Sequence, residues 1–205
     1  MDKREKTAIV FMADGMEMCE CLITVDILRR AGVKVITASV MDGKTVTASH
    51  QVRIEADVLV ADADYEAADI LILPGGRIGT ENLAASDIVT GQCIRYAGDS
   101  GKYAAAICAA PSVLSGLGIL DGRKATCHPD FAEKVQAGSS ISDGYADVSP
   151  LVTLTHESVT IDGNIITGQG LGATMDFALC IAGILTDRET ADRIASSVCY
   201  RKSSI

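Results

Sequence analysis

The stretch YAAAICAAPS, which runs from Tyr103 to Ser112, decides the fold and holds the most reactive candidate of the chain. Its apolar first half ends at Ile107 and is typical of a buried strand, while Pro111 is typical of the first turn of a helix. Cys108 is therefore predicted at a strand-to-helix turn, the geometry of a nucleophile elbow. The amino end of a helix favours thiolate over thiol. Burial as a small hydrophobic side chain is the alternative interpretation of this cysteine.

Apolar runs separated by helical patterns extend from this turn in both directions. The predicted strands cover residues 7–12, 33–39, 45–49, 52–60, 69–73, 103–107 and 124–127, with two short strands inside 158–167. The predicted helices cover residues 18–31, 87–98, 111–117, 129–137, 173–185 and 188–200, and a polar linker is expected at 138–149. This alternation predicts an α/β fold with a mostly parallel, doubly wound sheet, and 45–60 is interpreted as a meander off that sheet. Its ligand crevice is expected at the carboxyl ends of the strands.

Two glycine-containing loops have different interpretations. Gly75 and Gly76 follow a fully apolar strand, and they allow backbone amides to approach a bound group closely. Gly168, Gly170 and Gly172 come too late in the chain for a dinucleotide fingerprint, which would follow the first strand. We expect these three glycines to serve close packing between a helix and a strand.

Length and composition exclude several classes of protein. The chain has 205 residues, which predicts a single domain over 1–205. Its 18 Lys and Arg face 27 Asp and Glu, a net charge of -9, so neither nucleic acid nor an anionic membrane surface is an expected partner. No apolar run reaches the roughly 18 residues of a membrane span, and the first residues lead straight into a strand. A soluble, cytoplasmic protein is expected.

The cysteines do not indicate a disulfide framework or a metal site. Their number is 7, an odd count, and their spacing lacks the pairs typical of zinc ligands. Reduced thiols in a reducing compartment are the better interpretation.

Four motifs together resemble the DJ-one/ThiJ/PfpI superfamily, and they are most similar to its DJ-one/ThiJ branch. They are Ala13-Asp14-Gly15 with Glu20, Leu73-Pro74-Gly75-Gly76, Ala105-Ala106-Ile107-Cys108-Ala109-Ala110-Pro111, and Cys127-His128-Pro129. The resemblance covers nearly the whole chain. It implies a flavodoxin-like three-layer α/β sandwich, a homodimer, and a reactive cysteine at the elbow.

The resemblance also implies roles for single residues. Cys108 matches the nucleophile and Glu20 the carboxyl group whose hydrogen bond tunes the sulfur, although the helix dipole alone explains an acid at the start of a helix. Gly76, with Gly75, matches the loop whose amide faces the site, and Ala109 offers a second amide. A histidine near the cysteine is matched by His128, for which a catalytic role and a structural role both stay open.

The chain departs from the family pattern in three places. Gly170-Leu171-Gly172 stands where glycine-proline-glycine is expected, which predicts a different pocket rim, and the stretch Val52–Val60 lacks an additional cysteine near the expected dimer surface. Conversely, Cys19, Cys21 and Cys127 lie close in sequence to the expected site residues. A resolving thiol and simple packing are the two interpretations of these cysteines, and packing is favoured.

A nucleophilic thiolate beside a carboxyl group suits attack on a small reactive aldehyde. With methylglyoxal, Cys108 would form a hemithioacetal and Glu20 would move protons through an enediol to a thioester that water cleaves to lactate. Amides at Gly76 and Ala109 would stabilise the oxyanion. The predicted function is a glyoxalase or deglycase that acts on dicarbonyls or glycated groups and needs no cofactor and no metal.

Two alternatives remain at this stage. The same thiolate suits an oxidative-stress sensor or redox-regulated chaperone, in which Cys108 oxidises first and Glu20 stabilises the product. A cysteine protease or amidase is less favoured, because the side chains of the adjacent His156 and Glu157 diverge on an extended segment and no acid is placed by the sequence to orient His128.

Overall fold

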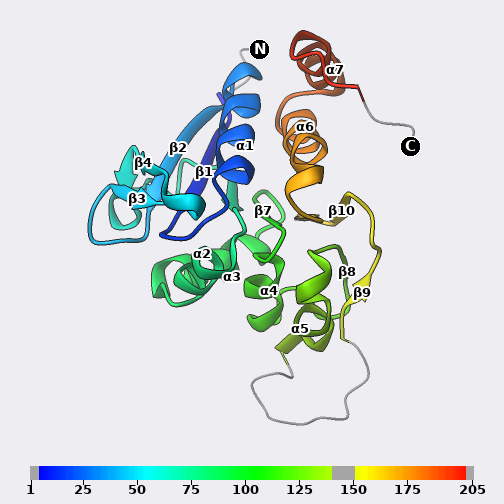
Figure 1. The fold of residues 1–205 in the computed structure, drawn as a ribbon. Coiled ribbons are helices and arrows are strands. Elements are labelled where there is room, and N and C mark those ends of the chain that lie inside the picture. Colours follow the sequence, from blue (N-terminus) through cyan, green and yellow to red (C-terminus); the bar gives the residue numbers. More distant parts are fainter. Residues whose placement is uncertain (1–4, 140–150, 202–205) are drawn as a thin grey trace.

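A seven-stranded sheet forms the centre of the computed structural model, which describes residues 5–139 and 151–201 (Figure 1). The strand order is β10-β11-β7-β6-β1-β2-β5, and every neighbouring pair is parallel except β10 with β11. The bounds are β1 Thr7–Met12, β2 Lys34–Ser39, β5 Val58–Leu59, β6 Ile70–Leu73, β7 Tyr103–Ile107, β10 Val159–Asp162 and β11 Ile165–Gly168. The prediction of a mostly parallel sheet is confirmed.

The central strands are apolar because both of their faces are covered. Every residue of β1 and β6 is buried, as expected for parallel strands between two helical layers. The chain begins in the middle of the sheet, runs outward through β2 to β5, and then returns to continue through β6 on the other side of β1. The carboxyl ends of β1 and β6 thus form the topological switch point of the sheet, where ligands bind in open α/β folds.

Helices cover both faces of the sheet, so the molecule has the predicted three layers (Figure 1). Val10 of β1 belongs to one core with Leu28 and Phe177, whereas its neighbour Phe11 points to the opposite core with Tyr96. The first core contains α1 Met18–Arg30, α6 Thr174–Leu185 and α7 Arg188–Ser197; the second contains α2 Arg77–Ala84, α3 Asp87–Ala97, α4 Pro111–Gly116 and α5 Ala132–Ala137.

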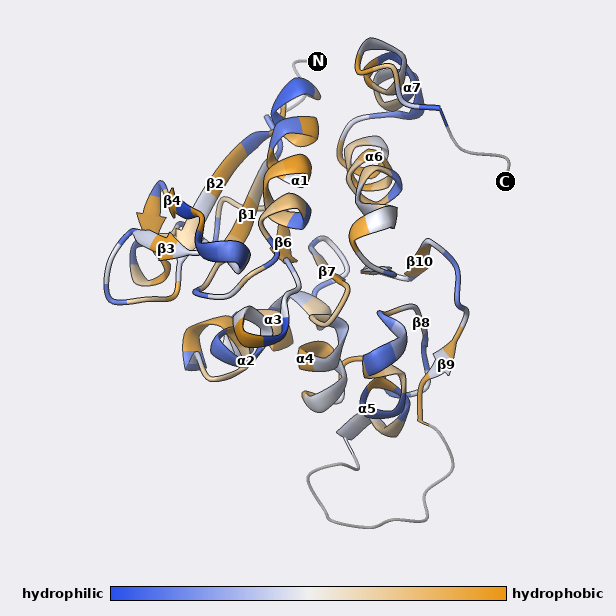
Figure 2. Cartoon of the chain, viewed as in Figure 1, coloured by the Kyte–Doolittle hydropathy of each residue, from blue (hydrophilic) through white to orange (hydrophobic). Residues whose placement is uncertain are grey.

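Amphipathic patterning explains how α1 attaches to the sheet. Figure 2 shows hydrophobic and hydrophilic residues together on this helix. Val25 and Leu28 are buried, while Asp26 and Arg30 are exposed and form an ion pair with 2.7 Å between Oδ2 and Nε. The apolar stripe packs α1 against the core and leaves the charges in solvent.

The structure corrects two strand predictions. The segment 45–60 is not one meander: β3 (Thr45–Thr47) and β4 (Arg53–Glu55) form a separate antiparallel pair, but β5 joins the main sheet beside β2. The predicted strand at 124–127 is only β8 (Lys124–Ala125), which pairs with β9 (Thr153–Leu154) away from the main sheet. Both differences concern short segments whose partners are distant in sequence.

Helix α2 was not predicted from the sequence, because a glycine interrupts its pattern. A Cβ atom on Gly79 would lie 2.5 Å from the Met16 Cα, so this glycine allows α2 to pack closely on the loop after β1. Short 3-10 turns complete the described elements: η1 Ser49–Gln51, η2 Val60–Asp62, η3 Pro129–Phe131 and η5 Leu171–Ala173.

The polar linker predicted at 138–149 lies almost entirely outside the described residues. Across 5–139 and 151–201, none of the helices has the length and apolar character needed to cross a membrane.

Candidate active site

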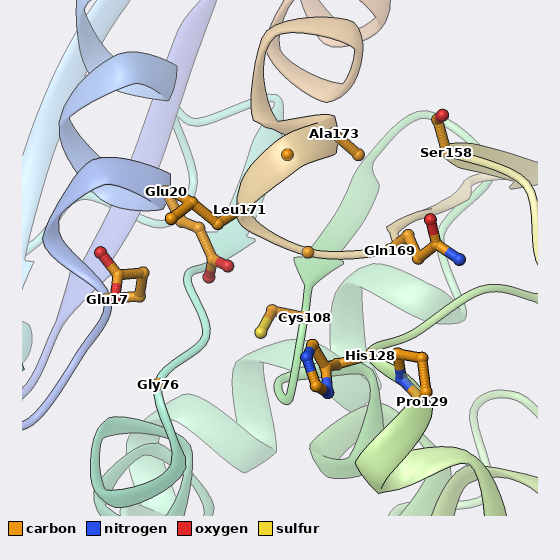
Figure 3. A pocket seen from close by; sticks show the side chains of 12 residues that line it. Glu17, Glu20, Gly76, Cys108, His128, Pro129, Ser158, Gln169, Leu171 and Ala173 are labelled. Carbon is orange, nitrogen blue, oxygen red and sulfur yellow. The ribbon is translucent and has the colours of Figure 1, made fainter. Parts of the chain in front are cut away.

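A pocket opens at the switch point of the sheet, where the loops after β1, β6 and β7 meet (Figure 3). The backbone N–H of Glu17 donates to the Gly75 carbonyl oxygen at 2.9 Å, which ties the first two loops together. The cavity has a volume of about 610 Å³ and is lined by Glu17, Glu20, Gly76, Cys108, His128, Pro129, Ser158, Gln169, Gly170, Leu171, Gly172 and Ala173.

Cys108 occupies the predicted turn between β7 and α4, and Pro111 is the first residue of that helix. Its φ is +66°, in the left-handed region, which costs about 1–2 kcal/mol for a residue other than glycine. Two backbone hydrogen bonds of 2.9 Å hold this conformation: its N–H donates to Gly168 O, and its carbonyl oxygen accepts from His128 N–H. The sulfur is thereby directed into the pocket (Figure 3).

Glu20 lies in the first turn of α1 and is only 1% exposed. The Gly75 N–H donates to its Oε2 at 2.9 Å. Burial raises the pKa of this carboxyl group to about 7, although contacts with the Cys108 thiol and the Gly75 N–H act in the opposite direction. The thiol contact is looser than a regular hydrogen bond, because Oε1 is buried without a regular hydrogen-bond partner among the described residues. A proton on Oε1 would turn this atom into a donor for the sulfur.

The environment of Cys108 differs from the one expected at a helix terminus. Burial, followed by the charge of Glu20, raises the pKa of the thiol, whereas the backbone N–H groups of Gly76 and Ala109 lower it. The expectation of a lowered pKa is therefore wrong, since desolvation, the largest cause, and the like charge of Glu20 outweigh the two amides. When Glu20 carries the proton, the like charge is gone and both amides still face the sulfur. The two groups influence the pKa of one another and therefore titrate as a coupled pair.

The two glycines of the loop after β6 have separate tasks. The backbone amides of both Gly76 and Ala109 face the sulfur. The Gly75 amide instead donates to Glu20. A Cβ atom on Gly75 would lie 2.6 Å from both Cys108 Cβ and Glu20 Oε2, so only glycine fits between the acid and the thiol.

His128 lines the same pocket, with 43% of its side chain exposed. Its Nδ1 accepts a hydrogen bond of 3.2 Å from the backbone N–H of Asp130, so the neutral ring carries its proton on Nε2. The Asp130 carboxylate, with Oδ2 3.8 Å from Nδ1, is an acid near the histidine that sequence reasoning did not find. Because a backbone N–H already occupies Nδ1, this carboxylate does not orient the ring as the acid of a catalytic triad does.

Several pocket residues were missed in the sequence. Glu17 precedes Glu20 by one turn of α1, and this spacing places both carboxyl groups at the same end of the helix, which is a signal that was available. Ser158 and Gln169 carried no such signal, because they reach the pocket from loops next to β10 and β11.

The late glycines have mixed roles. A Cβ atom on Gly168 would meet Ile107 and Phe177 at 2.8–2.9 Å, which confirms close packing between strand and helix at this position. Gly170 and Gly172 instead line the pocket together with Leu171. The departure from glycine-proline-glycine therefore lies in the pocket wall.

The additional cysteines near the site residues lie outside the pocket wall. Cys21 and Cys127 are buried, and burial raises the pKa of their thiols to about 12 and about 11. Cys19 is half-buried and does not line the cavity either. Packing explains the two buried thiols. In the part of the chain that the structure describes, no group of three or more His, Cys, Asp or Glu side chains is placed to hold a metal ion.

Comparisons with known proteins identify a family and agree with the fold. The DJ-1/PfpI family model matches residues 6–183. The Drosophila melanogaster protein dj-1beta is 34% identical over 193 residues, which are 94% of this chain and 96% of that protein, and a crystal structure of Drosophila DJ-1beta superposes with a TM-score of 0.86 at 31% identity, covering 97% of this chain and all of that one. The Caenorhabditis elegans protein named glutathione-independent glyoxalase DJR-1.2 is 30% identical, with 97% of this chain and 98% of that protein covered.

Proposed function

This chain belongs to the DJ-1/PfpI family, and from that membership and its site we propose that it is a glutathione-independent glyoxalase that converts dicarbonyls such as methylglyoxal to 2-hydroxy acids. The observation that carries the proposal is the juxtaposition of the buried Glu20 carboxyl group and the Cys108 thiol in one pocket, where two backbone amides face the sulfur. Such a pair supplies a nucleophile and a proton carrier at one place. The name of the worm relative supports the same reaction.

The proposed reaction uses the acid pair twice. Cys108 Sγ adds to the aldehyde carbon, and the proton held by Glu20 goes to the new alkoxide, giving a hemithioacetal. The Glu20 carboxylate then removes the hydrogen from that carbon, and the resulting enediol is reprotonated at the neighbouring carbon to give a thioester. Water cleaves the thioester to lactate and restores the thiol. Overall, methylglyoxal and one water become lactic acid, and no external electron acceptor takes part.

The surrounding groups would assist this sequence. The N–H groups of Gly76 and Ala109 would stabilise negative charge on sulfur and on the adjacent oxygen. The Nε2–H of His128 would donate to an oxygen of the substrate, because Nδ1 is already occupied by an acceptor bond. Adducts of dicarbonyls on amino or guanidino groups, the deglycase substrates, would enter the same reaction at the hemithioacetal stage.

The test is lactate production from methylglyoxal without glutathione. We expect turnover by the wild type and a loss of at least 100-fold in kcat/KM in Cys108→Ala and in Glu20→Gln, since each removes a reacting group. Cys199→Ala removes an exposed thiol outside the pocket and serves as the matched control with unchanged activity. Peptide and glutamine hydrolysis are expected to be absent. A wild type that forms no lactate overturns the glyoxalase proposal.

A redox sensor is the second candidate, favoured by the position of Cys108 in an open pocket beside amides that would also bind a sulfinate. Treatment with limiting peroxide followed by mass spectrometry distinguishes the two. If the protein makes no lactate but Cys108 is the first of the seven thiols to gain oxygen, the sensor explains the site.

We further propose a homodimer and a cytoplasmic location. An apolar groove lies beside α1, lined by Leu22, Ile23, Ile27, Met175 and Val198 together with polar residues, and Leu22 is 41% exposed. All seven cysteines are free thiols, which suits a reducing compartment.

A further inference from the structure

The wall of the active-site pocket has an uneven charge. Two of its twelve lining residues are acidic, Glu17 and Glu20, and within 5–139 and 151–201 no lysine or arginine lines it. Figure 3 shows the two carboxyl groups on one side of the pocket, with His128 and Gln169 on the other. Arg77 directly follows Gly76 of the pocket wall, but its Cζ atom lies 5.5 Å from the centroid of the Phe131 ring, and the residue lines a different cavity.

Glu17 is held in place without a cationic partner among the described residues. It is the N-cap of α1, where Oε1 accepts from Cys19 N–H at 3.2 Å, and Oε2 accepts from the Ser49 hydroxyl at 3.1 Å. Its backbone N–H is bonded to Gly75. Hydrogen bonds from neutral donors and the positive end of the α1 dipole stabilise the carboxylate, but they leave its net negative charge in place, so its field extends into the pocket.

We propose that Glu17 selects substrates by charge, so that the pocket admits uncharged and cationic α-oxoaldehydes and disfavours those that bear a carboxylate or a phosphate. This inference rests on the proposed glyoxalase function for the nature of the substrate, but not for the charge selection itself. The same field would favour release of the carboxylate product, which is an anion formed where the substrate was neutral. Glu17 does not touch the reacting atoms and acts through its charge.

The protonation of Glu20 supports this arrangement. Among the causes that raise the pKa of Glu20, the charge of Glu17 follows burial. The charge of Glu17 therefore disfavours two negative groups: an anionic substrate in the pocket and the ionised form of Glu20.

The first experiment measures charge selection without any turnover. Iodoacetamide and iodoacetate have similar size and react with thiols by the same displacement of iodide, but the second carries a negative charge. We would measure both alkylation rates at Cys108 by mass spectrometry, with the exposed Cys199 as the internal reference. The preference is the alkylation rate with iodoacetamide divided by the rate with iodoacetate. In the wild type, we expect this ratio to be at least about ten-fold larger at Cys108 than at Cys199. Glu17→Gln should reduce the difference between the two sites about five-fold.

The matched control is Glu133→Gln, which removes an equal charge from an exposed site on α5 outside the pocket. It should leave the preference unchanged. Glu17→Asp, which keeps the charge, should retain most of the preference, and raising the salt concentration should weaken the preference in the wild type. Equal preferences in the wild type and in Glu17→Gln overturn the proposal.

The second experiment uses substrates of equal chain length. 2-Oxopentanal is neutral, whereas 4,5-dioxopentanoate carries a carboxylate at the far end and would become 2-hydroxypentanedioate. The wild type should favour the neutral compound by about ten-fold in kcat/KM, and Glu17→Gln should narrow this difference mainly through KM of the anion. If neither compound turns over, the glyoxalase function fails while the alkylation result stands by itself. If both turn over equally, charge selection fails and the glyoxalase function remains.

Discussion

Glu20 destabilises the fold when it is ionised, because its charge is removed from water and no cation of the described part of the chain pairs with it. A carboxyl pKa raised from 4.5 to about 7 corresponds to a cost of about 3 kcal/mol for the ionised form. The folded protein holds this proton more tightly than the unfolded chain, so the free energy of unfolding falls as the pH rises from 4.5 to 7 and is lowest above 7.

Replacing Glu20 by Gln should remove this pH dependence. We would compare Cys108→Ala with the double variant Cys108→Ala/Glu20→Gln, so that only one group of the pair titrates. In urea unfolding, the advantage of the double variant should grow by about 2–3 kcal/mol between pH 5 and pH 8. Glu81→Gln, at an exposed position of α2, should show no such growth. A constant difference across this range would mean that Glu20 is not held protonated by burial.

Single residues of the site were predictable to different degrees. Cys108 lies inside the motif at 105–111, and Glu20 follows the motif at 13–15 at a short distance in the sequence. The structure brings the two side chains together. The task of the Gly75 amide and the acid beside His128 depend on which atom a backbone N–H points at, and this is decided by loop geometry and not by residue type.

At the scale of elements, His128 caps the 3-10 turn η3 through Nδ1. His128→Asn retains a side-chain acceptor for the Asp130 N–H, but His128→Ala does not, so the alanine variant should be about 1 kcal/mol less stable than the asparagine variant. This difference would be measured by urea unfolding of both variants under the same conditions.

The same pair tests the tautomer of His128. A ring whose free nitrogen carries the proton is no base for the thiol, so His128→Asn should alkylate at Cys108 within about three-fold of the wild-type rate. A loss of ten-fold or more in the alkylation rate would instead assign a general base role to His128.

Packing between β11, β7 and α6 depends on Gly168. In Gly168→Ala, the new methyl group would meet Ile107 and Phe177 at 2.8–2.9 Å, so we expect a loss of about 1–3 kcal/mol in the free energy of unfolding. Gly172→Ala is the matched control, because its Cβ atom would have no neighbour within 4 Å and its φ is not positive. Equal thermal stability of the two variants would show that β11 and the side chains packed on it can move to accommodate the methyl group.

Elements with a strong local pattern were predictable, and those that depend on distant partners were not. The apolar run of β6 and the periodic pattern of α1 are visible in the sequence. In α2, by contrast, Gly79 serves contact with Met16 and interrupts the helical pattern, and β5 has only two residues whose place beside β2 is set by the sheet.

At the scale of the whole molecule, the flavodoxin-like fold was predictable because the order of strands and helices restricts the topology, whereas assembly between chains stays a prediction. If the groove beside α1 is the dimer surface, Leu22→Glu should shift the protein to monomer in sedimentation velocity, because it places a charge in an apolar contact. The matched control Ile94→Glu changes an exposed residue of α3, on the opposite helical layer, and should stay dimeric. A monomeric wild type would contradict the homodimer.

The hydrogen bond between Cys108 N–H and Gly168 O has a consequence for biosynthesis. Chains leave the ribosome from the amino end, so Cys108 emerges well before β11, the strand that contributes to fixing its backbone. Until β11 pairs with β7, only the hydrogen bond from His128 N–H to the Cys108 carbonyl oxygen is available to hold Cys108 in its left-handed conformation. A nascent or prematurely terminated chain that ends before residue 168 therefore lacks one of the two backbone hydrogen bonds that direct the sulfur into the pocket, and we expect the full reactivity of Cys108 only after β11 has joined the sheet.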